Sequence, residues 1–143
     1  MDTMFRPFQK WREARELRRT LLEFHSELRK NLESFYVMDQ LGRLRPFRLE
    51  AWSRVSPLGF IGSDENILRC FRAMEEHNRL LEDFSNFEAW YSSDLDNKTQ
   101  ANARILHEKR DAPQKNFPAF EGLIKAALSA LEAQLQSRKV LKH

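Results

Sequence analysis

The stretch from Leu17 to Phe35, LRRTLLEFHSELRKNLESF, decides the fold class of this chain. Its large apolar residues recur at spacings of four, three, four, four and three: Leu17, Leu21, Phe24, Leu28, Leu32 and Phe35. At about 100° per residue these side chains form one stripe along an α-helix. Pro7 fits the first turn of such a helix and Gly42 fits the residue that ends it. The pattern therefore predicts a first helix over residues 7–41.

The rest of the chain continues in helical patterns separated by short breaks. A polar, turn-like segment covers residues 92–97, and a second break, with Pro113, covers residues 112–116. Proline has no N–H to donate and normally ends a helix, so we place a boundary there. The remaining predicted helices cover residues 46–55, 64–91, 98–111 and 118–137.

Few residues of the chain favour tight turns. Only 4 glycines and 5 prolines occur among 143 residues, too few for an all-β protein with many turns. Short connections between helices favour antiparallel neighbours. We therefore predict one all-α domain over residues 1–143. It is an antiparallel four-helix bundle with a long first helix and a short extra helix in the first connection.

Two features bear on the compartment. The lone cysteine, Cys70, cannot form an internal disulfide, so a reducing environment is expected. No apolar run approaches the roughly 20 residues that a membrane-spanning helix needs, and the N-terminus lacks the apolar block of a signal peptide. We therefore expect a cytoplasmic protein with no membrane association.

Charge is distributed unevenly along the chain. Residues 1–62 hold 12 Lys/Arg and 8 Asp/Glu, a net of +4, whereas residues 63–97 hold 3 and 9, a net of −6. Residues 98–143 hold 9 and 4, a net of +5. One interpretation is internal complementarity, in which an acidic helix lies between basic ones. The other is a surface with two faces of opposite sign, one of them for an anionic partner.

Five arginines are the candidates for anion contact. Arg12, Arg15 and Arg19 share one face near the start of the first predicted helix, where positive charge opposes the helix dipole. Arg45 and Arg48, in a basic cluster with Arg43 and Arg54, form a second group in the connection that follows. The two groups make a convincing anion site only if the fold brings them together.

No motif identifies a reaction. None of the histidines, at positions 25, 77, 107 and 143, has a glutamate three residues earlier, which excludes the di-iron bundle pattern. The four glycines cannot form a phosphate-binding loop. We therefore expect no catalytic residue, metal site or cofactor, and no enzymatic activity.

Several polar residues within the predicted helices receive structural interpretations. His77, beside Glu75 and Glu76, is expected on a solvated helix face, and His25 is expected to be partly buried and hydrogen-bonded. Asn78 occupies an apolar position, so we expect its side chain to form a hydrogen bond with a neighbouring segment. Cys70 is expected to pack in the core.

The first helix provides the leading functional hypothesis. About 35 residues at 1.5 Å each give roughly 50 Å, longer than a compact bundle of this size needs. One end is therefore expected to project and to contact a partner through Phe5, Phe8 and Trp11. This predicts a non-enzymatic protein-interaction or self-association module that forms a homo-oligomer or binds another protein.

Two alternatives remain open. The first is binding of nucleic acid or another polyanion through the five arginines. The second is a small-molecule or catalytic bundle, which requires an internal pocket with converging polar groups such as His25 and Asn78. The apolar residues of the loop at 58–61 either fold back onto the bundle or form a further contact surface.

Overall fold

The computed structural model describes the backbone of residues 2–55 and 64–140 and the side chains of residues 9–54 and 64–137. The helices are α1 (Asp2–Leu41), α2 (Glu50–Val55), α3 (Glu65–Ser93), α4 (Gln100–Asn116) and α5 (Phe120–Val140), with 3-10 turns η2 (Leu95–Asn97) and η3 (Phe117–Ala119). The described residues contain no strand. The all-α class, the long first helix and the short extra helix are confirmed. The predicted loop at 58–61 lies outside the described residues.

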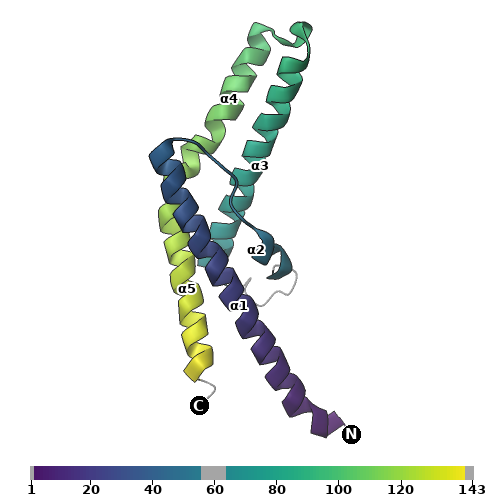
Figure 1. The fold of residues 1–143 in the computed structure, drawn as a ribbon, viewed down its shortest axis with the longest axis vertical. Helices are drawn as coiled ribbons and strands as arrows, with labels where there is room; N and C mark the ends of the chain where they lie inside the picture. Colours follow the sequence, from purple (N-terminus) through teal and green to yellow (C-terminus); the bar gives the residue numbers. More distant parts are fainter. Residues whose placement is uncertain (1, 56–63, 141–143) are drawn as a thin grey trace.

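Helix α5 organises the bundle. It packs against both α1 and α3, while α4 packs against α3, and α2 lies on α1. Figure 1 shows that α1 and α3 run in one direction and that α4 and α5 run in the opposite one, so each of these packed long-helix pairs is antiparallel. The α3–α4 hairpin continues past the C-terminal end of α1, and the N-terminal part of α1 extends the other way.

Residues at the helix ends explain where α1 and α3 stop and start. Gly42 adopts φ +67°, a conformation that glycine accepts without steric cost, and its N–H donates to the Met38 carbonyl at 2.8 Å. Asp64 caps α3, because its carboxylate accepts from the backbone N–H groups of Asn66 and Ile67. Both boundaries agree with the sequence prediction to within a few residues.

The predicted break at residues 112–116 is wrong. Helix α4 continues through Pro113 to Asn116, and η3 then leads directly into α5. A proline removes one N–H donor from the helix, and the Pro113 ring is buried. The residues at the junction keep right-handed helical dihedral angles. Consequently α4 and α5 follow one another in the same general direction, and α4 extends the molecule.

The second predicted helix is also shorter than expected. It covers Glu50–Val55 in place of residues 46–55, because residues 43–49 run without regular secondary structure between α1 and α3. Phe47, Ala51 and Trp52 from this part of the chain are nevertheless buried, as their apolar character predicts.

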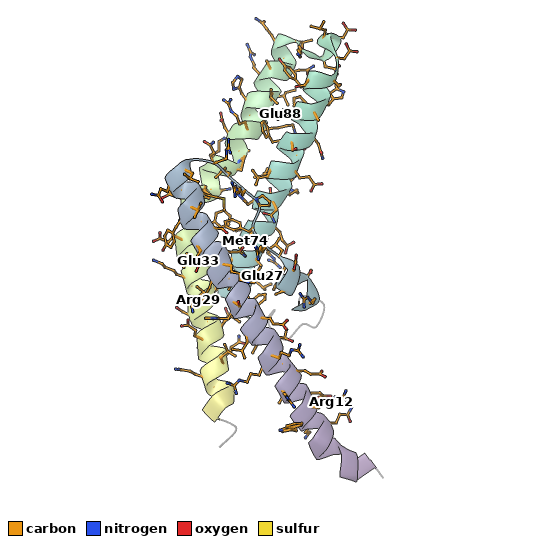
Figure 2. All side chains as sticks on the ribbon, in the orientation of Figure 1. Arg12, Glu27, Arg29, Glu33, Met74 and Glu88 are labelled. Carbon is orange, nitrogen blue, oxygen red and sulfur yellow. The ribbon has the colours of Figure 1, made fainter. Side chains whose placement is uncertain are left out.

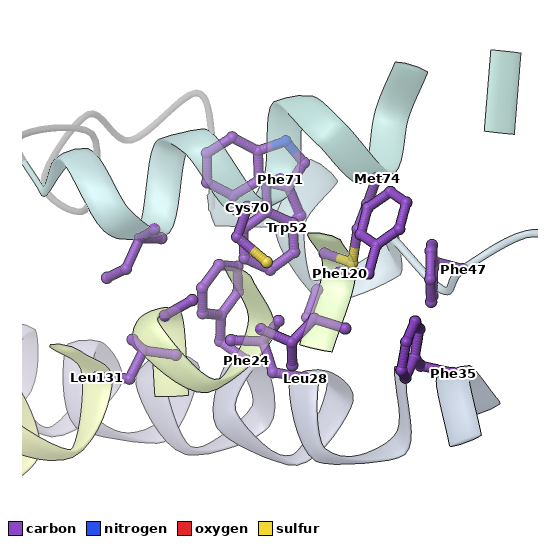
Figure 3. Close-up of a cluster of buried hydrophobic side chains, with 14 of the residues drawn as sticks. Phe24, Leu28, Phe35, Phe47, Trp52, Cys70, Phe71, Met74, Phe120 and Leu131 are labelled. Atoms are coloured by element: carbon purple, nitrogen blue, oxygen red, sulfur yellow. The ribbon is translucent and has the colours of Figure 1, made fainter. Parts of the chain in front are cut away.

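The core lies where α1, α5 and the first half of α3 meet (Figure 3). Its centre is aromatic: the Phe24 and Phe71 ring centroids are 4.4 Å apart, and the Trp52 ring stacks on Phe71 at 4.6 Å. Full burial of one such side chain contributes about 1.5 to 3 kcal/mol. The predicted stripe of α1 enters this core at Leu21, while Leu17 is only partly buried.

The helices are amphipathic and not uniformly apolar. Among the residues that the structure describes, no helix combines the length and apolar character needed to cross a membrane.

Candidate functional site

The N-terminal part of α1 projects from the bundle, as predicted. The side chains of residues 9–16 are all exposed, and Figure 2 shows Arg12 on this extension, away from the other helices. Trp11 is exposed, and the Arg15 guanidinium lies 5.5 Å from its ring centroid. Of the three predicted contact residues only Trp11 has a described side chain, because those of Phe5 and Phe8 lie outside the described set.

The first group of arginines lies on this extension with nearby carboxylates. Arg12 pairs with Glu16 at 3.7 Å, and Arg19 pairs with Glu23 at 3.5 Å. Both pairs are exposed and one helical turn apart, a geometry that contributes only about 0.3 to 0.5 kcal/mol. The arginine face is therefore partly neutralised.

The second group lies in the irregular segment of residues 43–49, after α1 ends. The Arg48 backbone is bonded to Asn31, and the Arg45 N–H donates to the Met38 sulfur at 3.0 Å. Asn31 is twelve residues beyond Arg19, or about 18 Å at 1.5 Å per residue. The structure does not bring the two predicted arginine groups together, so they do not form one anion site.

Two asparagines fix the segment of residues 43–49 by pairing with its backbone. Asn31 donates to the Arg48 carbonyl at 2.9 Å and accepts from the Arg48 N–H at 2.9 Å. Asn78 does the same with the Phe47 carbonyl and N–H, both at 2.8 Å. The predicted tie between Asn78 and a neighbouring segment is confirmed. Asn31, which the sequence analysis missed, holds the same segment from α1.

Two carboxylates anchor α2. Both oxygens of the nearly buried Glu27 lie 3.1 Å from the Ala51 N–H, at the positive end of the short helix. The Trp52 indole N–H donates to Glu75 at 2.6 Å. The polar residues facing α2 therefore serve to position it.

The expectation that His77 faces solvent is wrong. Its ring is buried, with its centroid 5.0 Å from that of Phe47 and 5.4 Å from that of Phe120. Its Nε2 lies 3.0 Å from the Arg45 carbonyl, which can only accept, so Nε2 carries the proton. Burial lowers the pKa of His77, because it disfavours the charged ring.

The predictions for His25 and Cys70 are confirmed. His25 is partly buried, and its Nε2 lies 3.0 Å from the Glu132 carboxylate on α5. Cys70 is fully buried, and burial raises the pKa of its thiol to about 12, which disfavours the nucleophilic thiolate. Within the described ranges, no three His, Cys, Asp or Glu side chains are grouped to hold a metal ion.

A groove follows the C-terminal end of α1 and the segment after it; we call it the basic groove. Its volume is about 570 Å³, and four of its lining residues are exposed cations, Lys30, Arg43, Arg45 and Arg48. Val37 and Leu41 line it as well, 49% and 68% exposed. Glu33 is the one carboxylate among its lining residues.

The four cations of the basic groove are not engaged in ion pairs with any residue that the structure describes. Exposed arginines beside exposed aliphatic side chains fit a ligand that is both anionic and apolar. Arg45 and Arg48 were candidates for anion contact from the sequence, and Arg43 belongs to the same basic cluster of the connection. Lys30, Val37 and Leu41 were not predicted, because only the fold places them beside these arginines.

The α3–α4 hairpin carries a second candidate surface. Lys109 pairs with Asp83 at 2.6 Å and lies 5.6 Å from the centroid of the Phe87 ring. Trp90 is seven residues after Asp83, and Ile105 is four residues before Lys109, so both lie on the side of the hairpin that holds this ion pair. We call Phe87, Trp90 and Ile105 the hairpin face; Trp90 is 47% exposed.

The end of the hairpin exposes another apolar side chain. Leu95 in η2 is 83% exposed and lies between Asp94 and Asp96, which are also exposed. From its sequence this segment was predicted to be a polar turn. The signal that could have identified it is a large apolar residue between two acidic ones in a short connection.

The third hypothesis, a pocket with converging polar groups, gains no support from His25 and Asn78. His25 faces Glu132 on α5, whereas the Asn78 side chain forms hydrogen bonds with the Phe47 backbone. A small hollow of about 220 Å³ beside His77 is lined mainly by apolar residues, including Leu80, Pro113 and Phe120.

Comparison of the chain with protein-family models, with curated protein sequences and with solved structures found no match.

Proposed function

We propose that this chain is a helical protein-interaction module that associates with a second copy of itself. The observation that carries the proposal is the α3–α4 hairpin, which extends past the core and leaves apolar side chains uncovered. In the part of the chain from residue 78 to the end of α4, Pro113 is the only described residue that is buried.

A pair of helices can bury only the stripes that face each other. In a larger bundle, further helices cover the adjoining side chains. The hairpin face has no such cover among the described residues, and Trp90 and Ile105 remain exposed. Removing apolar surface from water contributes about 25 cal/mol per Å², so contact with another protein would stabilise this face.

The polar residues of the core support a binding role over a chemical one. The side chains of Glu27, Asn31 and Asn78 form hydrogen bonds with backbone groups and so hold those groups in position. Burial lowers the pKa of His77, and its Nε2 donates to the Arg45 carbonyl. Buried polar groups that are committed in this way specify the packing of the fold.

Sedimentation equilibrium of the full chain at micromolar concentrations tests the proposal. The wild-type average mass is expected to rise with concentration above that of one chain. The double variant Trp90→Ser, Ile105→Ser should associate less, whereas Leu22→Ser, which changes an equally exposed residue on α1, should behave as the wild type. A wild-type protein that stays monomeric throughout this range would contradict self-association.

The N-terminal contact proposed for Phe5, Phe8 and Trp11 requires its own measurement. Trp11→Ser in the same experiment distinguishes it from the hairpin. Association that depends on Trp11 and not on Trp90 would assign the contact to the projecting part of α1.

A further inference from the structure

We infer that the hairpin end of one copy binds in the basic groove of the next copy, so that copies associate head to tail. The hairpin end is defined here as Asp94, Leu95 and Asp96. The inference rests on the proposed self-association and assigns its contact to the basic groove and the hairpin end, which adjoins the hairpin face where the Asn97 side chain donates to the Trp90 carbonyl.

The groove and the hairpin end have matching chemistry. The groove offers four cations that form no ion pair among the described residues, beside the exposed Val37 and Leu41. The hairpin end offers Leu95, the most exposed large apolar side chain described, between two carboxylates that likewise form no ion pair there. If Leu95 of one copy packs on Val37 and Leu41 of the next, the carboxylates on either side of Leu95 lie toward the cations of the groove.

Hydrogen bonds hold the hairpin end in shape. The Asp94 carboxylate accepts from the Asp96 N–H at 3.1 Å. The Asn97 side chain donates to the Trp90 carbonyl at 2.9 Å, and the Asn102 side chain donates to the Asn97 carbonyl at 2.7 Å. An ordered turn loses little conformational entropy when it binds, so the exposed leucine is presented at low cost.

The two surfaces of one molecule cannot meet each other. Asn31, beside the groove, contacts Met74 in the first half of α3. The hairpin end lies twenty residues further on, about 30 Å away along the helix. Figure 1 shows the hairpin leading away from the end of α1, so the occupant of the groove must come from another copy.

The charge and composition of the groove favour this occupant over a nucleic acid. A phosphate backbone would use the cations and leave Val37 and Leu41 against water. The acidic hairpin end uses both. Because the two surfaces differ, their contact is heterologous and leads to a closed ring or an open chain of copies.

Two variants that each remove one half of the contact provide the test. The groove variant is Arg43→Glu, Arg45→Glu, and the end variant is Leu95→Ser, Asp96→Lys, which retains the Asp94 cap. All four side chains are exposed, and circular dichroism checks that both proteins remain helical. Each variant alone is expected to associate at least about tenfold more weakly than the wild type.

An equimolar mixture of the two variants is the decisive sample. It contains one intact groove and one intact hairpin end, so it should form a 1:1 heterodimer with the mass of two chains and extend no further. As a control with the same charge change, Arg12→Glu, Arg15→Glu should associate as the wild type. A second arm titrates a single-stranded DNA oligonucleotide into the wild type and the groove variant.

Each outcome decides the inference. If the wild type associates and the mixture stays monomeric, the head-to-tail contact is wrong while self-association stands. If both variants associate as the wild type, the contact lies elsewhere. If the wild type is monomeric, both proposals fall. DNA binding that requires Arg43 and Arg45, without heterodimer formation, would assign the groove to a polyanion.

Discussion

Asn31 shows how a single buried amide can hold an irregular segment. It is fully buried, and its side chain makes two hydrogen bonds with the Arg48 backbone, both at 2.9 Å. In Asn31→Ala the Arg48 N–H and carbonyl lose these partners, which should cost about 2 to 3 kcal/mol of unfolding free energy. Urea denaturation measures it. Asn86→Ala, at an exposed position of α3, should stay within about 0.5 kcal/mol of the wild type.

His77 should make stability depend on pH. Its folded-state pKa lies below the ordinary 6.5, so the unfolded chain binds more protons near and below that pH. The free energy contributed by the neutral ring is fully present above pH 6.5 and is lost as pH falls through the folded-state pKa. A proton added to the ring would lie on Nδ1, which is buried and has no hydrogen-bond partner among the described residues.

Replacing the ring isolates this effect. His77→Phe keeps an aromatic ring beside Phe47 and Phe120 and removes the titration. Its urea midpoint should therefore fall less than that of the wild type between pH 7 and mildly acidic pH. His107→Gln changes an exposed histidine and serves as the control. Equal pH dependence in the wild type and His77→Phe would show that other groups govern the acid response.

The sequence contains a signal for the burial of His77. Residue 77 lies about one turn beyond Met74, so the helical period places it beside the apolar side of α3. The spacing of apolar residues along a helix predicts which side of the helix is buried, but it does not predict how wide the buried side is. The buried side of α3 is wider than one stripe, because α3 packs on α5 and also contacts the segment that contains Arg45 and Phe47.

At the scale of elements, α1 shows that a helix can form over residues that are not buried. Its 40 residues span about 60 Å, whereas the 21 residues of α5 span about 32 Å. Periodicity predicted the helix but could not predict where its neighbours end. Hydrogen exchange should therefore divide α1: amides of residues 9–16 exchange fast and those of residues 21–38 slowly. Uniform protection, measured by mass spectrometry at low concentration, would contradict the projecting end.

The junction of α4 and α5 was predicted less well than α1, for a local reason. A proline such as Pro113 normally indicates a helix end, but here the loss of one N–H is accompanied by burial of the ring. Whether a proline ends a helix or is tolerated in it depends on tertiary packing, which the sequence alone does not provide. The hairpin, and with it the exposed Leu95, follows from this junction, since α4 is kept away from the α1–α5 contact.

At the scale of the whole molecule, the two extensions predict an unusual shape. A compact domain of 143 residues has a radius of gyration of about 14 to 15 Å. A straight helix as long as α1 has by itself a radius of gyration of about 17 Å. The hairpin extends beyond the opposite end, so the monomer must exceed the compact value clearly (Figure 1). Small-angle X-ray scattering, extrapolated to zero concentration, should give more than about 17 Å.

The same scattering experiment connects shape with association. The groove variant Arg43→Glu, Arg45→Glu should stay near the monomer value at concentrations where the wild type associates, because it lacks half of the contact. Its substitutions are exposed and leave the helices intact. The wild type should increase in maximum dimension with concentration, since head-to-tail contact lengthens the particle. A dilute value near 15 Å would mean that α1 or the hairpin folds back. Such a folded-back arrangement would also cover the surfaces on which both proposals depend.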